Sequence, residues 1–507
     1  MSAASAPRAA SPGWSWLAGI ARQPSGRAEF CVWLALFAAV VAVRVYLVEL
    51  VPFAIWSKDA GSYAESADHW LKTGQWITDG RRGPIYSLFI AGCAKAWGSV
   101  DGVMIAQHVL GGVAVLFGML VLRLLWGRSA LVPVALCSYA YAVYGLPVSL
   151  EHLVRNETLL FFFSSLALSC WYLAIHFRKG WWLLPAGCFG ALTMLTKSVY
   201  GPFPVLVVGA LIFAGWKMRA PMFGRIALFA LGFALPYLGV RALDRMSVAH
   251  EPPEPQSGIL LYGRTAQFTH LDGGLEPELK AAIRAEVEDY RRLPDLDNNV
   301  ILKRTVVPHL RRILYARGQT PADLNRLCRQ LAIEGVLHHP AAYLFQMLDD
   351  CRRLHLSTCA KVKAPAYDNL ESLEELLPQL DPQTTLVDPQ ATLTKLRAVK
   401  DRNLFRKYHQ WLHSAWLFRV APVLLTTLLL PWLIRRARGE PRLWWIGCAG
   451  LWYFTIVLLC TVGRPLERYV IPVAPVMFWT LGSAVCIGWQ ALTALAHART
   501  ETSFRES

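Results

Sequence analysis

A cluster of ionisable side chains follows the first long apolar stretch, within the sequence SKDAGSYAESADHWLKTGQWITDGRRGPIY at 57–86. The cluster includes Asp59, Tyr63, Glu65, Arg81 and Arg82. A carboxylate can take a proton from an attacking hydroxyl, and guanidinium groups can stabilise charge that builds on a departing phosphate. These residue types therefore suit the transfer of a group from a phosphate-activated donor.

Three later segments place further charged side chains beside apolar stretches. The segments are 149–158, 195–202 and 462–472, and they contribute Glu151, Arg155, Glu157, Lys197, Tyr200, Arg468 and Tyr469. Charged residues from separate parts of a chain can form a site when the fold brings them to one face. Such a site suits a substrate that stays in a bilayer while its chemistry occurs at the interface.

The elements that must position these residues are predicted to be membrane-spanning helices. The chain has 507 residues, of which 54% are hydrophobic and 17% are charged, and its mean hydropathy is +0.34. These values exclude an ordinary soluble domain. Apolar runs long enough to cross a bilayer occur at 30–52, 103–125, 129–147, 157–177, 181–197, 200–217, 223–243, 414–434, 443–462 and 470–496.

One further apolar stretch, 84–98, is short and contains Lys95, which favours a helix beside the membrane over one that crosses it. With that choice the basic loops around Arg178, Arg225 and Arg435 all fall on the cytoplasmic side, as the positive-inside rule requires. Much of the net charge of +16 then lies in loops that face anionic lipid, so no nucleic-acid partner is needed to explain it. The four polar segments fall on the opposite, extracytoplasmic face.

We therefore expect an all-α integral membrane protein, with a bundle of about ten spans, juxtamembrane helices in the first outer loop and a mostly helical extracytoplasmic insertion. Within the insertion, the stretch after Pro255 predicts a strand or an extended cover, and 275–355 predicts helices, one of which starts at Thr320. The predicted parts are a cytoplasmic N-terminal segment (1–29), an N-terminal transmembrane module (30–243, with its first outer loop at 53–102), the soluble insertion (244–412), C-terminal transmembrane helices (413–496) and a cytoplasmic tail (497–507).

Three motifs in order resemble a known superfamily. They are Asp59-x-x-x-Tyr63-Ala64-Glu65 followed by Gly83-Pro84-x-Tyr86, then GALTMLTKSVYGPFP at 190–204, and ERYVIPVAPVM at 467–477. Together they resemble the lipid-dependent glycosyltransferases of the GT-C superfamily. The resemblance is closest to glycosyltransferase family 39, which holds protein O-mannosyltransferases, and to the related lipid A aminoarabinose transferases. It covers residues 30–215 and 440–495.

The resemblance implies an enzyme that transfers a sugar from a polyprenyl-phosphate donor to an extracytoplasmic lipid, glycan or protein acceptor, with inversion at the anomeric carbon. It implies that Asp59 is the essential acid, acting as general base or holding a divalent metal (Mg, Mn or Zn). Arg81 or Arg82, with Lys197 and Arg468, would hold the donor phosphate. The expected location is a bacterial inner membrane, with the site on its periplasmic face. Residues expected to bind substrate or support the site are Tyr63, Glu65, Glu151, Arg155, Glu157, Tyr200 and Tyr469.

Two positions of the first loop depart from the families that it resembles: the residue after Asp59, and the residue before Pro84, which is Gly83 here and Lys in the aminoarabinose transferases. Ala60 follows Asp59, where the family often has a second acid. If the site uses a second carboxylate, that group must come from elsewhere in the polar segments. The candidates are Glu65, Asp68, Glu151 and Glu157.

Structural roles for these residues stay open beside the functional ones. Asp59 could cap a helix, Lys197 could reach the interface without touching substrate, and arginines could contact lipid head groups. The set Glu151, Arg155 and Glu157 could be a salt-bridged helix entrance, and Arg468 with Tyr469 could only fix the last helix. Two ionisable residues inside predicted spans, Arg44 and His108, could pack internally or face lipid.

Two other functions fit a polytopic chain, namely a transporter or lipid flippase, and a non-catalytic component of envelope-polysaccharide assembly. A transporter is expected to hold ionisable groups near the midplane and to show related halves, whereas here the charges gather at one interface. The sequence contains no G-x-x-x-x-G-K-[ST] loop and no G-x-G-x-x-G after a strand, so it offers no recognisable nucleotide cradle.

Overall fold

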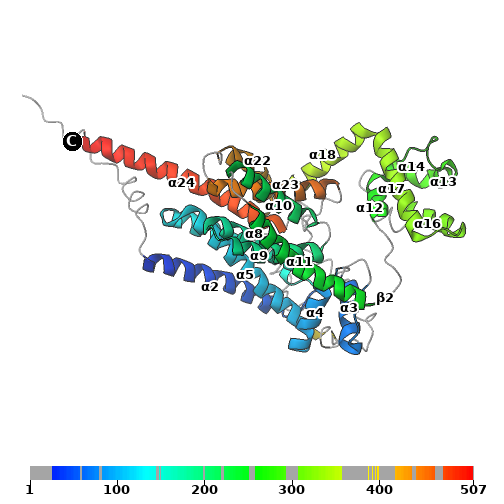
Figure 1. Ribbon diagram of the computed structural model, residues 1–507, viewed down its shortest axis with the longest axis horizontal. Helices are drawn as coiled ribbons and strands as arrows, with labels where there is room; N and C mark the ends of the chain where they lie inside the picture. The colour runs from blue at the N-terminus through cyan, green and yellow to red at the C-terminus, as the bar shows by residue number, and fades with distance from the viewer. Residues whose placement is uncertain are drawn as a thin grey trace, which may run out of the picture.

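The computed structural model shows a bundle of apolar helices with a smaller helical unit at one end (Figure 1). It describes residues 26–56, 60–78, 83–143, 148, 150–197, 200–218, 222–249, 257–292, 306–356, 386, 391, 394–395, 397–398, 417–436, 441–462 and 472–505.

Each of the ten predicted spans coincides with a helix of the bundle. The helices are α2 (Gly26–Leu50), α5 (Asp101–Trp126), α6 (Leu131–Ala142), α8 (Glu157–His176), α9 (Leu183–Thr196), α10 (Pro202–Met218), α11 (Phe223–Met246), α22 (Leu417–Arg436), α23 (Pro441–Val462) and α24 (Ala474–Arg505). Among the described residues, five helices are long and apolar enough to cross a membrane: α2, α5, α8, α11 and the Ala474–Ala496 part of α24. The expectation of an all-α, multi-pass membrane protein is confirmed.

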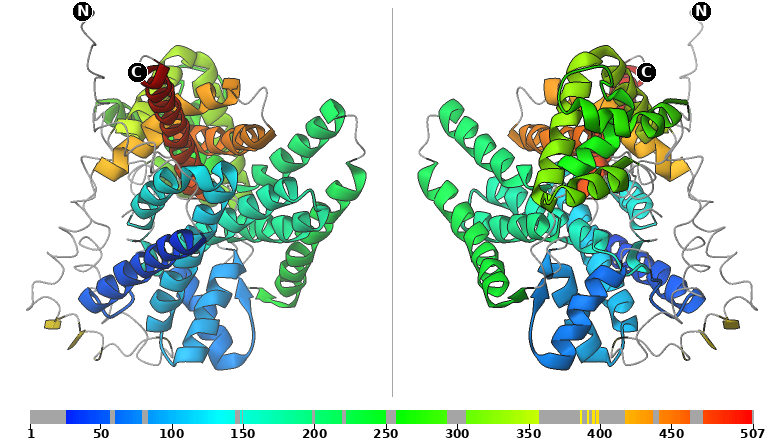
Figure 2. Two further views of the ribbon diagram at one scale, coloured as in Figure 1. Left: turned by 90° about the vertical axis from the view of Figure 1, so that its left-hand side faces the viewer. Right: turned by 90° about the vertical axis from the view of Figure 1, so that its right-hand side faces the viewer.

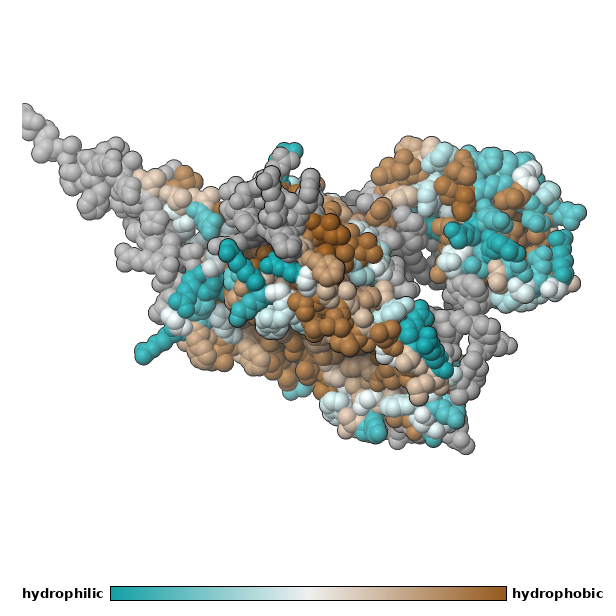
Figure 3. Space-filling model, in the orientation of Figure 1, coloured by the Kyte–Doolittle hydropathy of each residue, from teal (hydrophilic) through white to brown (hydrophobic). Residues whose placement is uncertain are grey.

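The outer surface of the bundle is apolar, as contact with lipid requires. On α2, the large side chains of Phe30, Leu34, Phe37 and Val41 recur every three or four residues and are all exposed. Figure 3 shows a hydrophobic band along the bundle, between hydrophilic ends. By contrast, α8 lies inside the bundle: 83% of its apolar stretch is buried, compared with 22% for α2.

Two glycines let α9 and α11 cross with their backbones almost in contact. A Cβ added at Gly187 would lie 2.1 Å from the carbonyl oxygen of Phe229, and one added at Gly232 would lie 1.9 Å from that of Leu184. Small residues at such crossings are typical of packing between membrane helices, where close approach of the backbones supplies the attraction.

Two shorter helices, α3 (Ala60–Thr73) and α4 (Pro84–Trp97), lie where α2 ends and α5 begins (Figure 1). We call this the α3–α4 end of the bundle. The stretch predicted as a short helix beside the membrane is α4, which has Pro at its first position and ends at Gly98, whose φ of 73° suits glycine. It packs against α3, α5 and α9.

Short parallel backbone pairings tie three segments together at this end. Strand β1 (Ile77–Thr78) pairs with β2 (Val248–Ala249), the stretch that follows α11. A single bridge also joins Ile55 to Leu153. The first loop is thereby fixed both to the exit of α11 and to the segment before α8.

The smaller unit, residues 257–356, has its own buried core. Its helices are α12 (Ser257–Thr265), η4 (Ala266–Phe268), α13 (Pro277–Ala282), α14 (Arg284–Arg292), α16 (Val306–Ala316), α17 (Pro321–His338) and α18 (Pro340–Leu356). The predicted start at Thr320 is confirmed by a capping box with Asp323. Figure 2 shows this unit and the α3–α4 pair on opposite sides of the same end of the bundle.

The prediction of a strand or extended cover after Pro255 is wrong for residues 257–268, because they form α12 and η4. Helical packing decides the outcome: α12 lies against α17, and the Asn325 side chain accepts from the Gly258 backbone N–H at 2.7 Å. The helical stretch predicted to start at Thr320 is divided into α17 and α18 at Pro340, whose ring cannot continue α17.

The chain after this unit returns to the α3–α4 end. The carbonyl of Leu386 accepts from the backbone N–H of Val100 at 2.9 Å, and the Lys395 ammonium lies 2.7 Å from the Asp101 carboxylate. The insertion thus contacts the start of α5, and through α18 it also contacts α22 and α23.

Candidate functional site

The predicted site residues fall into two groups. Asp59, Arg81, Arg82, Arg468 and Tyr469 lie outside the described residues, so their roles stay predictions. The structure describes the other seven, which are Tyr63, Glu65, Glu151, Arg155, Glu157, Lys197 and Tyr200.

Glu157 and Lys197 form an ion pair between two helix ends. Glu157 lies in the first turn of α8, and Lys197 is the residue on which α9 ends. Their carboxylate and ammonium are 3.8 Å apart, with 3% of the Glu157 side chain exposed and 21% of the Lys197 side chain. The Lys197 side chain is therefore held by Glu157 and is partly exposed.

The start of α4 and the segment before α8 both contact the backbone at the end of α9. The Asn156 side-chain amide donates to the carbonyl of Thr196 at 3.2 Å. A Cβ added at Gly83 would lie 2.0 Å from the carbonyl oxygen of Leu195. Only glycine allows this approach. Gly83, which follows Arg81 and Arg82 in the sequence, therefore lies against Leu195, two residues before Lys197.

Tyr86 and Gln107 connect α4 to the segment before α8. The Tyr86 hydroxyl donates to the Gln107 side-chain oxygen at 3.0 Å, and the Gln107 amide donates to the carbonyls of Glu151 and Leu153 at 2.9 and 2.8 Å. Tyr63 packs edge-on against Tyr86, with ring centroids 4.9 Å apart. These bonds hold residues 151–153 in one conformation.

The same segment is paired with the first loop. The Ile55 N–H donates to the carbonyl of His152 at 2.8 Å, and the Val154 N–H donates to the carbonyl of Ile55 at 2.9 Å. Ile55 precedes Asp59 by four residues in the sequence. The segment that carries Arg155 and Glu157 is therefore registered against the segment that leads to Asp59.

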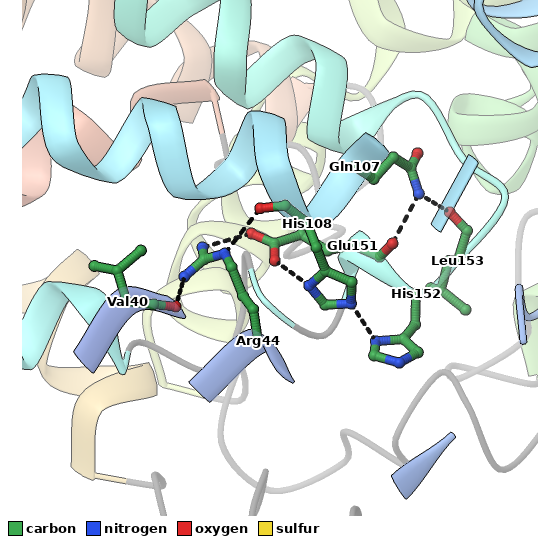
Figure 4. A network of polar contacts seen from close by, with 7 residues as sticks. All are labelled: Val40, Arg44, Gln107, His108, Glu151, His152 and Leu153. Carbon is green, nitrogen blue, oxygen red and sulfur yellow. Dashed lines mark hydrogen bonds and ion pairs between the residues drawn. The ribbon is translucent and has the colours of Figure 1, made fainter. Parts of the chain in front are cut away.

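Residues 151 and 152 of this segment also belong to a buried network of charged and polar side chains (Figure 4). Arg44 on α2 contacts Glu151 at 2.8 Å, and its Nε donates to the carbonyl of His108 at 3.0 Å. Glu151 Oε2 lies 2.7 Å from His108 Nδ1, and His108 Nε2 lies 2.9 Å from His152 Nδ1. All four residues are at most 6% exposed.

With Glu151 ionised opposite Arg44, the network takes one hydrogen-bonding direction. A buried guanidinium keeps its proton and requires a counter-charge, which Glu151 supplies. Because a carboxylate only accepts, His108 donates from Nδ1, and its Nε2 then accepts from His152. Gly111 provides the space, since a Cβ there would lie 1.8 Å from Glu151 Oε1.

This network was missed from the sequence. Arg44 and His108 were expected to pack internally or face lipid, and packing is what the structure shows. The available signal was the Glu151-His152 pair, together with Arg44 and His108, which lie near the same membrane face inside two predicted spans. Sequence alone could not assign the pairing, because its partners lie 43 to 107 residues apart.

Among the candidates for a second acid, only Glu157 lies beside Lys197. Glu65 is exposed on α3, Asp68 pairs with Lys72 at 2.8 Å along the same helix, and both carboxylate oxygens of Glu151 are bonded within the buried network. Tyr200 is buried and packs against Trp452. Arg155, which lies between His152 and Glu157 in the sequence, is half-buried.

No group of three His, Cys, Asp or Glu side chains placed to hold a metal ion occurs in the part of the chain that the structure describes. At Glu157 the neighbouring position is taken by the Lys197 ammonium. These residues therefore do not fit a two-carboxylate metal cage, and a metal at Asp59 stays a prediction.

No protein-family model and no curated protein matches the chain. Among solved structures, it is similar to ArnT from Cupriavidus metallidurans bound to undecaprenyl phosphate, with 16% identity, a TM-score of 0.36, and coverage of 89% of this chain and 78% of that one. It is also similar to the Archaeoglobus fulgidus oligosaccharyltransferase in complex with Zn and sulfate, with 12% identity and a TM-score of 0.42. That match covers 92% of this chain and 51% of the other, so this chain spans about half of that protein. At these scores the likenesses carry no argument about function.

Proposed function

We propose that this protein is a glycosyltransferase that moves a sugar from a polyprenyl-phosphate donor to an extracytoplasmic lipid, glycan or protein acceptor. The observation that supports this best is the partly exposed side chain of Lys197, held by Glu157 at 3.8 Å at the α3–α4 end of an apolar bundle. A cation at such an interface suits the phosphate of a substrate whose tail remains in lipid. The proposed location is a bacterial inner membrane, with the site on the periplasmic face.

Lys197 and Glu157 have distinct roles in the proposed mechanism. Lys197, with Arg81 or Arg82 and Arg468, holds the donor phosphate and stabilises the charge that grows on it as the sugar leaves. Glu157 keeps the ammonium in place and compensates its charge when no donor is bound. Tyr63, Tyr200, Arg155 and Tyr469 line or support the same region.

The reaction is a direct displacement. Asp59 takes the proton of the acceptor hydroxyl, the acceptor oxygen forms a bond to the anomeric carbon, and the bond from that carbon to the phosphate oxygen breaks. Polyprenyl phosphate leaves with the electron pair, and the configuration at the anomeric carbon is inverted. In this proposal the insertion 244–412 covers the site or recognises the acceptor, between the transmembrane parts 30–243 and 413–496.

The buried Arg44–Glu151–His108 network supports a second candidate, because ionisable groups inside a membrane bundle are typical of transport pathways. A transporter or flippase would move the lipid-linked sugar and leave its phosphate bond intact. The two functions therefore differ in whether free polyprenyl phosphate appears.

The test compares Lys197→Met with Lys95→Met in lipid vesicles supplied with a panel of polyprenyl-phosphate sugars. Lys95 is an exposed lysine of α4 at the same end of the bundle, and it serves as the matched control. We expect Lys197→Met to raise the KM for the donor and to slow polyprenyl-phosphate release by 10-fold or more, about the value of one charge-assisted phosphate contact. Equal loss in both variants, or none in either, would contradict a donor-binding role for Lys197.

A further inference from the structure

Three side chains of helix α18 that carry polar groups are turned toward its own unit. Asp350 forms a buried ion pair with Arg264 of α12. One turn earlier, the Gln346 side chain accepts from Gln267 at 2.5 Å, and Tyr343 packs edge-on against Phe268. Positions 343, 346 and 350 recur at helical spacing, so one face of α18 is fixed against α12 and η4.

The opposite face of α18 is apolar and exposed. Leu344 is 56% exposed, Phe345 73% and Leu348 57%, and at the end of α17 Leu337 is 73% exposed. We call these four residues the α18 face. A helix on a water-exposed surface has the reverse pattern, with apolar residues inward and charged ones outward. Clustered large apolar side chains of this kind mark an interaction surface.

The position of α18 indicates what covers this face. The helix packs against α22 and α23, and those helices expose Leu425, Leu428, Leu451 and Leu458. Figure 1 places α18 beside the ends of α22 and α23, at the end of the bundle that also carries α3 and α4. In Figure 3 hydrophobic surface is visible both on the bundle and on the near part of the smaller unit.

We infer that the α18 face lies in the bilayer interface and anchors the 257–356 unit to the membrane surface beside the bundle. The bilayer is favoured over a second copy of the chain because α18 adjoins spans whose own exposed side chains are apolar. An interfacial helix of this kind buries its apolar face at the boundary between head groups and acyl chains. This inference is independent of the proposed function.

Photo-crosslinking of the full chain tests it. A benzophenone amino acid replaces Phe345 in one variant and Tyr315 in the other, and each is illuminated in vesicles of phosphatidylethanolamine and phosphatidylglycerol. Tyr315 is 41% exposed on α16 of the same unit, where it serves as the matched control. Both positions are exposed, and an unchanged thermal unfolding curve verifies the fold of each variant.

We expect lipid adducts at position 345 to exceed those at position 315 several-fold by mass spectrometry. A covalent dimer formed at 345 would show that a second copy covers the face and would overturn the inference. Equal lipid labelling at the two positions, or no lipid adduct at 345, would overturn it as well.

Discussion

Two ion pairs near the α3–α4 end, Arg44 with Glu151 and Lys197 with Glu157, differ in how deeply they are buried. The Arg44 side chain is 7% exposed, and its partner Glu151 is fully buried. Lys197 retains 21% of its side-chain surface, and its distance to Glu157 is longer. A buried, fully bonded pair stabilises one conformation of the chain. A partly exposed pair can exchange its carboxylate partner for an incoming phosphate, which is why we propose that Lys197 binds the donor.

Replacement of Glu151 by Gln is expected to destabilise the protein. The amide removes the counter-charge of a buried guanidinium, and breaking a buried pair in this way costs about 3–5 kcal/mol. Thermal unfolding in detergent measures the effect, with Glu65→Gln, on the exposed face of α3, as the control. A double variant, Glu151→Gln with Arg44→Met, should recover part of the loss. An unfolding temperature for Glu151→Gln equal to that of the control would show that the network does not hold the fold.

At the scale of elements, close backbone approach positions the site. Helix α4 begins against the end of α9 because Gly83 has no side chain, and α9 crosses α11 at Gly187 and Gly232. A methyl group at any of these contacts would clash with a backbone carbonyl. The clash cannot be relieved by moving a flexible side chain, so the helices themselves would have to shift.

Gly83→Ala is expected to lower activity by separating the start of α4 from Lys197. A Cβ there would lie 2.0 Å from the Leu195 carbonyl oxygen, whereas one at Gly92, in the middle of α4, meets nothing within 4 Å. Gly92→Ala should therefore keep full activity, with slightly higher stability from better helix propensity. The measurement is donor turnover at saturating acceptor, and equal turnover in the two variants would contradict the proposed role of this contact.

Gly232→Ala should disrupt the α9–α11 crossing, with a loss of stability of about 1–3 kcal/mol from overpacking. Gly239, two turns later on the same helix, has nothing within 4 Å of its added Cβ, so Gly239→Ala is the control. Thermal unfolding of the two variants in detergent compares them directly. Unfolding at the same temperature would mean that the two helices can separate without cost.

At the scale of the whole molecule, the apolar spans and the short helix α4 could be predicted because hydrophobic run length and loop charge depend only on local sequence. The start at Thr320 followed from local capping chemistry. The Arg44–Glu151–His108 network and the packing of α12 on α17 could not be predicted. Both depend on tertiary contacts between distant segments, which override local propensity.

The candidate site could be predicted only in outline. Residue types placed Glu157 and Lys197 among the candidates, yet their pairing depends on how α8 and α9 meet. Four carboxylates were open as the second acid, and burial and bonding separate Glu157 from Glu65, Asp68 and Glu151. The proposal that the molecule is a transferase depends on Asp59, in the first loop, as its acid.

The most direct test measures release of free polyprenyl phosphate from a panel of polyprenyl-phosphate sugars by wild type and by Asp59→Asn, with Asp272→Asn, an exposed carboxylate of the smaller unit, as control. The account predicts release by wild type and by Asp272→Asn, no release by Asp59→Asn, and unchanged thermal unfolding in all three. Release by Asp59→Asn at the wild-type rate would contradict it. So would movement of the lipid-linked sugar across the vesicle membrane with its phosphate bond intact.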